Sequence, residues 1–103
     1  MNSRNKGASG ERELANVLKE HGYQARRGQQ FCGSNGDADV VGLLGFHIEC
    51  KRVERLDVTK AMHQSINDAR DGEIPIVCHR KNREKWLVTI SLDDFLELLK
   101  QRR

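Results

Sequence analysis

Two carboxylates and a lysine near the middle of the chain have the types and spacing of a site for metal-assisted hydrolysis. Asp39 precedes Glu49 by ten residues, and Lys51 follows Glu49 by two. Mg²⁺ prefers one or two protein carboxylates and completes its coordination with water and substrate phosphate oxygens. Such a site can lower the pKa of a bound water and stabilise charge on a scissile phosphate. Lys51 could orient the attacking water or stabilise the anionic transition state.

A β-hairpin would bring these side chains to one place. A three-residue loop at 43–45 puts Gly45 at the position that needs a positive φ. One face of the hairpin is then apolar and suits a core, with Gly42 opposite Phe46, Val40 opposite Ile48 and Ala38 opposite Cys50. The other face pairs Asp39 with Glu49, Asp37 with Lys51 and Val41 with His47. A two-residue loop would mix the two faces, so the three-residue loop is preferred.

Two readings of this charged face are open. Cross-strand carboxylates repel, so a lysine or a divalent cation must offset them if they converge. The alternative is a solvated, exposed sheet face on which Asp37 and Lys51 form an ion pair. Convergence of the side chains on one spot favours the metal site.

Two further polar residues could belong to this site. Glu11 lies within the apolar stripe of the first predicted helix, where a buried carboxylate is costly unless it is paired or bound to metal. It could equally be a first-turn glutamate that favours the helix N-terminus. Gln64 flanks the apolar stripe of the second predicted helix and could simply be solvated.

Helices and strands that position these residues can be read from periodicity and caps. Asp57 caps the second helix, and Ser91 with Asp94 gives a capping-box signature for the last one. The predicted elements are a helix at 8–21, strands at 23–27, 38–42 and 46–53, a helix from 57 to 72, strands at 74–79 and 86–90, and a C-terminal helix. The order is αβββαββα. We expect the segment from 46–53 through the helix to 74–79 to be a right-handed crossover between parallel strands.

Length, net charge and cysteine content limit the possible domain organisation, partners and location of the protein. A chain of 103 residues fits one domain, residues 1–103. Its net charge of +3 permits a nucleic-acid partner without requiring one. Neither a signal peptide nor an apolar run long enough for a membrane span is seen, so we expect a soluble, cytoplasmic protein. The odd number and wide spacing of Cys32, Cys50 and Cys78 favour reduced, buried thiols.

These residues and their order resemble the PD-(D/E)xK nuclease superfamily. The first-helix segment 7–14 and the short length are similar to archaeal Holliday junction resolvases and their viral relatives. The resemblance implies an α/β (α+β-like), restriction-endonuclease-like αβββαβ core with a central mixed sheet flanked by helices. It also implies Mg²⁺ or Mn²⁺ as cofactor. The implied site consists of Asp39, Glu49 and the carbonyl of Cys50 as metal ligands, Lys51 as catalytic lysine, and Glu11 and Gln64 as further members.

One departure from the family pattern affects the ligand set. Ala38 stands where the family has proline. Proline ligates nothing, so the chemistry can survive this change. Asp37 becomes an alternative ligand.

The preferred reading of function is a Mg²⁺-dependent DNA endonuclease that acts on branched or junction DNA as a homodimer, with no membrane and no small-molecule cofactor. Two active sites would suit cleavage of two strands. Candidate phosphate contacts are the basic residues Arg4, Lys6, Arg12, Arg26 and Arg27, which could instead be ordinary surface charges. The alternatives are a nuclease for other DNA structures, a non-catalytic nucleic-acid-binding module on the same fold, and a zinc protein. The zinc protein would use the three cysteines with His47 or His79.

Overall fold

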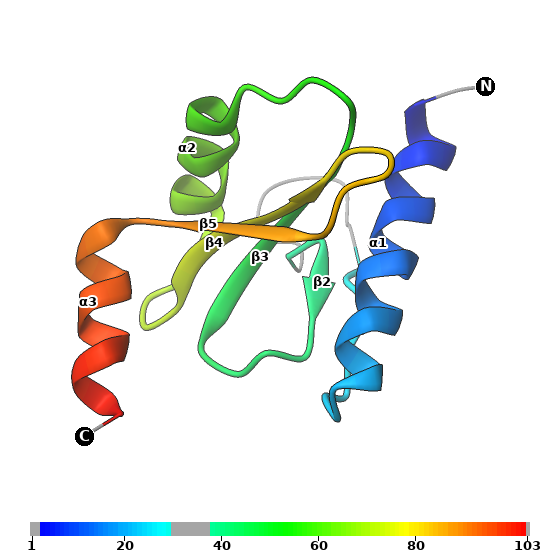
Figure 1. The fold of residues 1–103 in the computed structure, drawn as a ribbon. Helices are drawn as coiled ribbons and strands as arrows, with labels where there is room; N and C mark the ends of the chain where they lie inside the picture. The colour runs from blue at the N-terminus through cyan, green and yellow to red at the C-terminus, as the bar shows by residue number, and fades with distance from the viewer. Residues whose placement is uncertain (1–2, 30–37, 103) are drawn as a thin grey trace.

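The fold is built on a mixed five-stranded sheet, and helices α1 and α2 cover the two faces of this sheet (Figure 1). The structure is a computed structural model that describes residues 3–29 and 38–102. Its elements are α1 (Ser3–Glu20), β1 (Arg26–Arg27), β2 (Val40–Val41), β3 (Phe46–Arg52), α2 (Val58–Asp68), β4 (Ile74–Arg80), β5 (Leu87–Ile90) and α3 (Leu92–Gln101). The predicted order αβββαββα and the mixed sheet flanked by helices are confirmed.

Strand order in the described sheet follows the chain, β1-β2-β3-β4-β5. Only β3 and β4 run parallel among the described strands, and α2 connects them as predicted. Their ladder is long, from Phe46 opposite Ile74 to Arg52 opposite Arg80. The middle of β4 is continuously buried because helices cover the sheet on both sides.

The predicted hairpin register is confirmed. Val40 lies opposite Ile48, and the N–H of Phe46 donates to the Leu43 carbonyl at 3.1 Å to close the loop. Gly45 has the expected positive φ of 87°. Gly42 is also required, since a Cβ there would lie 2.6 Å from the carbonyl oxygen of Gln24.

Strands β1 and β2 are shorter than predicted. Each has only two residues, so β2 begins only at Val40 and Asp39 lies in a bend before it. The expected pairing of Ala38 with Cys50 is absent from the described ladder. The bend has a specific cause, because the Asp39 side chain occupies the N–H of Cys50.

Helix bounds also differ from the prediction. Helix α1 begins at Ser3, five residues early. Helix α2 has the predicted Asp57 cap, whose Oδ1 accepts from the N–H of Lys60 at 3.1 Å. It ends at Asp68 and not at Gly72, because the backbone becomes extended at Ala69.

The apolar stripe predicted for α2 is only partly right. Ala61 is buried, whereas Val58 and Ile66 are exposed. Ser65 is buried and anchors the helix to the sheet, where its hydroxyl donates to the carbonyls of His47 and Ile76. The register of α2 on the sheet is therefore set by this hydrogen-bonding serine.

Alternate residues of β3 point to opposite faces of the sheet. Ile48 and Cys50 join the core under α1, which contains Leu14, Ala15, Ala25, Val40, Ile76 and Cys78. His47 and Glu49 point toward α2 and are also buried. In the part of the chain that the structure describes, no helix has the length and apolar character needed to cross a membrane.

Candidate active site

Asp39 lies in the bend just before β2, where hydrogen bonds of its side chain and of its backbone hold it in place. Its carboxylate Oδ2 accepts from the N–H of Cys50 at 2.8 Å. Its own N–H donates to the Ile48 carbonyl at 3.1 Å, and its carbonyl accepts from the N–H of Gly28 at 2.9 Å. The carboxylate is therefore held against the backbone between Glu49 and Lys51.

Glu49 is a buried carboxylate with one nearby cation. Its side chain is only 5% exposed, and the Nζ of Lys51 lies 3.6 Å from its Oε2. Burial, followed by the charge of Asp39, raises the pKa of Glu49 to about 7, although Lys51 acts in the opposite direction. The alternative of a solvated, exposed charge is therefore wrong for Glu49.

Glu11 approaches Asp39 from the opposite face of the sheet. Its side chain is 14% exposed and accepts a hydrogen bond from the Nε of Arg27 at 3.0 Å. Burial raises the pKa of Glu11, and the charge of Asp39 adds to this, while Arg27 partly offsets both. Because α1 begins at Ser3, Glu11 is not in its first turn, and the helix-terminus explanation for this glutamate is wrong.

The structure thus brings Glu11, Asp39, Glu49 and Lys51 together, with Asp39 in the middle. It does not bring in Gln64, which is exposed and makes no hydrogen bond or ion pair with the described residues. Asp37, the alternative ligand, lies outside the described residues.

The predicted basic residues divide into three groups. Arg27 is bound to Glu11. Arg12 and Arg26 are exposed. Arg4 and Lys6 are in the opening residues of α1, whose side chains lie outside the described part of the chain.

The cysteine–histidine set of the zinc alternative does not converge. Cys50 and Cys78 are buried, unbonded neighbours under α1, where burial raises the pKa of both thiols. His47 and His79 lie at odd positions of β3 and β4 and therefore face α2. His79 contacts Thr89 at 2.9 Å through Nε2. Cys32 lies outside the described residues.

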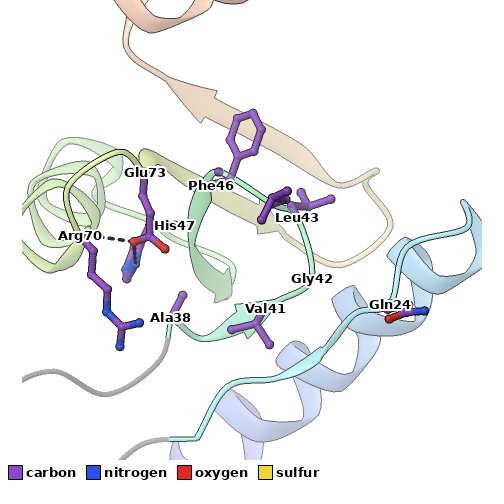
Figure 2. A pocket seen from close by; sticks show the side chains of 11 residues that line it. Gln24, Ala38, Val41, Gly42, Leu43, Phe46, His47, Arg70 and Glu73 are labelled. Carbon is purple, nitrogen blue, oxygen red and sulfur yellow. Dashed lines mark hydrogen bonds and ion pairs between the residues drawn. The ribbon is translucent and has the colours of Figure 1, made fainter.

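Two residues beside Glu49 were not assigned to this site from the sequence. His47 and Asp68 each place a ligand atom within 4.8 Å of the other and of a Glu49 oxygen. Figure 2 shows His47 at the edge of a pocket of 330 Å³, beside Glu73 and Arg70. Strand alternation had already put His47 on the same face as Glu49, and that was the available signal. Asp68 could not be assigned before the docking of α2 was known.

The residues around Asp39 fit a divalent cation. Glu49 is buried next to a second carboxylate, and one lysine at 3.6 Å does not restore its normal pKa. A cation coordinated by oxygen atoms would compensate both carboxylates. The backbone of Cys50 already contacts the Asp39 carboxylate through its N–H. Asp39, Glu49 and the Cys50 carbonyl are the residues that would hold the cation.

Because burial destabilises the charged form of Glu49, the stability of the protein should depend on pH. Glu49 titrates near pH 7 when folded and at an ordinary value of 4.5 when unfolded, so the wild-type protein loses stability as the pH rises between these values. Glu49→Gln is neutral throughout. We expect equal stability of the two proteins below pH 4.5 and a more stable variant above pH 7, by at most about 3 kcal/mol.

Chemical denaturation across this pH range, in the presence of chelator, measures the difference. Addition of Mg²⁺ above pH 7 should raise the melting temperature of the wild type and leave Glu49→Gln unchanged. A variant that is less stable than the wild type at high pH would contradict the assignment of an uncompensated charge to Glu49.

Comparisons with known proteins agree with this arrangement. None of the curated proteins matches the chain. Among solved structures, Hjc from Archaeoglobus fulgidus, a Holliday junction resolvase from an archaeal hyperthermophile, aligns with a TM-score of 0.62 and 26% sequence identity, over 82% of this chain and 72% of that one. Residues 2–103 match the profile of the family described as "Phage putative PDDEXK endonuclease". The fold, the hairpin with Asp39 and Glu49-Cys50-Lys51, and this match over nearly the whole sequence together show that the chain belongs to the phage PDDEXK endonuclease family.

Proposed function

We propose that this nuclease is a divalent-metal-dependent DNA endonuclease that cuts branched DNA, including Holliday junctions, as a homodimer. One observation carries the metal-dependent chemistry. The Asp39 carboxylate is bound to the backbone at Cys50, beside a buried Glu49 whose charge, within residues 3–29 and 38–102, only Lys51 partly compensates.

Each residue has a distinct task in this mechanism. Asp39, Glu49 and the Cys50 carbonyl hold the ion, with Mg²⁺ or Mn²⁺ as the expected species. When bound, such an ion activates water and neutralises charge on the scissile phosphate. Lys51 lies on the same strand face as Glu49 and can orient the water or stabilise the developing anion.

Glu11 links the carboxylates to a basic surface. It accepts a hydrogen bond from Arg27, whose side chain is still 40% exposed and can therefore also meet a DNA phosphate. The segment after Arg27 is tied to the site, because the N–H of Gly28 donates to the Asp39 carbonyl. Phosphate contacts at Arg12, Arg26 and Arg27, with Arg4 and Lys6, would thus position the DNA backbone over the carboxylates.

Branched DNA and the homodimer have separate support. The resolvase from Archaeoglobus fulgidus shares the fold and 26% of the aligned sequence. Helix α3 offers a surface for a second copy, since none of its residues is buried although four apolar side chains share one face. A twofold pair of active sites suits a substrate with two equivalent strands to cut.

A cleavage assay with several DNA structures tests the proposal. Labelled four-way junction, flap and linear duplex DNA of the same sequence are incubated with Mg²⁺, with Mn²⁺ and with chelator. We expect metal-dependent nicking of the junction, with paired cuts on opposite strands, and slower cleavage of the linear duplex.

Two other outcomes of this assay would change the proposed function. Equal cleavage of all three structures would contradict the preference for branches while keeping the nuclease. Tight junction binding with no cleavage in either metal would support a non-catalytic binding module on this fold.

A further inference from the structure

We propose that His47, Glu49 and Asp68 form a second divalent-cation site, on the α2 side of Glu49, that takes a transition-metal ion in preference to Mg²⁺. The three side chains come from β3 and α2, and their ligand atoms all lie within 4.8 Å of one another. The inference concerns binding alone and does not depend on the cleavage activity proposed above.

His47 supplies the strongest argument. Its side chain is only 5% exposed, and its Nδ1 faces the Glu73 carboxylate at 3.6 Å. A nitrogen of the ring also lies within 4.8 Å of ligand oxygens of Glu49 and Asp68. A buried imidazole that converges with two carboxylates is a ligand set that transition-metal ions accept.

Glu73, which is held by Arg70, orients the imidazole of His47. The Oε1 of Glu73 lies 3.6 Å from the Nδ1 of His47, and it accepts a hydrogen bond from the N–H of Arg70 at 2.8 Å (Figure 2). Histidines that bind metals usually present their other ring nitrogen to a carboxylate or carbonyl, which fixes the tautomer. Glu73 has this relation to His47, and it favours Nε2 as the atom that faces the ion.

Asp68 is brought over β3 by the docking of α2. Ser65, one helical turn before it, is fully buried and donates to the carbonyl of His47. The charge of Asp68 acts unfavourably on Glu49, so the two carboxylates oppose each other without a cation between them. Asp68 is itself exposed, which leaves the site open to solvent on this side.

The ligand chemistry separates this site from the one at Asp39. There, all three expected ligands are oxygen atoms, which suits Mg²⁺. One imidazole with two carboxylates suits Zn²⁺ or Co²⁺ better, because nitrogen ligands favour later first-row ions. Glu49 is common to both sites through its two carboxylate oxygens.

Cobalt titration under saturating Mg²⁺ tests the site on the full chain. Visible absorption reports Co²⁺ with a nitrogen ligand, and isothermal titration gives the stoichiometry. We expect one Co²⁺ per chain that excess Mg²⁺ does not displace. His47→Gln and Asp68→Asn should each weaken it at least about tenfold, and Glu73→Gln should weaken it by about tenfold.

Matched controls separate the site from general metal binding. His63→Gln and Asp93→Asn remove an exposed histidine and an exposed aspartate elsewhere, and both should leave Co²⁺ binding unchanged. Asp39→Asn should retain it as well. Because Asp68 is exposed, its asparagine variant should fold normally even if His47→Gln does not, which circular dichroism in chelator checks.

The proposal is overturned by absence of Co²⁺ binding under saturating Mg²⁺. It is equally overturned if Asp68→Asn binds Co²⁺ as tightly as the wild type. Loss of Co²⁺ binding in Asp39→Asn would show that the ion uses the other site.

Discussion

The Asp39→Asn variant should lose cleavage by about a hundredfold or more while keeping its fold and its affinity for DNA. Asparagine preserves an oxygen that can accept from the N–H of Cys50, so the bend before β2 should survive. The substitution removes the negative charge that a divalent cation needs. Single-turnover cleavage of a four-way junction gives the rate, and fluorescence anisotropy gives the affinity.

Two companion variants divide the roles within the site. Glu49→Gln should lose both cleavage and Mg²⁺ binding, because it removes a ligand. Lys51→Ala should lose cleavage to a similar extent but keep Mg²⁺ binding, because its amine lies 3.6 Å from Glu49 and its proposed role is toward the water and the developing anion. Near-wild-type cleavage by either carboxylate variant would refute the proposed ligands.

Exposed acidic residues provide the control for these substitutions. Asp71→Asn removes one negative charge in the turn after α2, outside the proposed set of Asp39, Glu49 and Lys51. Its rate and affinity should equal those of the wild type. If it also lost cleavage, the effect of Asp39→Asn would reflect overall charge and not coordination.

Much of the hairpin could be predicted because local rules determine it. The alternation of apolar and charged residues excludes a one-residue shift, and a three-residue loop that ends at Gly45 keeps the two faces separate. The structure accordingly has Val40 opposite Ile48 and a positive φ at Gly45. The caps of α2 and α3 at Asp57 and Ser91 were predictable for the same reason.

Tertiary contacts explain what could not be predicted. The length of β2 depends on the Asp39 side chain, which takes the N–H of Cys50. The burial of Glu49 depends on α2, whose docking is set by Ser65 and not by the apolar stripe. The contact of Arg27 with Glu11 joins residues 16 apart in sequence, and no local pattern indicates it.

The last prediction concerns α3, the helix that the single chain leaves uncovered. Four of its five apolar side chains recur at i, i+3, i+4 and i+7 and are exposed: Leu92, Phe95, Leu96 and Leu99. The neighbouring edge strand β5 adds Leu87 and Val88, each 58% exposed. Figure 1 shows α3 beyond the end of β5 and far from α1. An exposed apolar helix face of this kind marks an interaction site.

Phe95→Asp should convert the proposed homodimer into a monomer. A twofold interface contains each residue twice, so one substitution places two charges in the apolar contact and should weaken association by about a hundredfold or more. Sedimentation velocity or light scattering across a concentration series measures the change. The monomer should keep its circular dichroism spectrum, since Phe95 is half-exposed in the single chain and contributes little to its core.

Glu97→Ala on the same helix is the matched control, because it removes only an exposed ion pair with Lys100. Its mass should equal that of the wild type. The monomeric Phe95→Asp protein should still nick one strand of a junction, since Asp39, Glu49 and Lys51 all belong to one chain, but it should lose the paired cuts on opposite strands. A wild type that is monomeric at every concentration would refute the dimer, and paired cleavage by a monomeric variant would show that two copies are not needed for it.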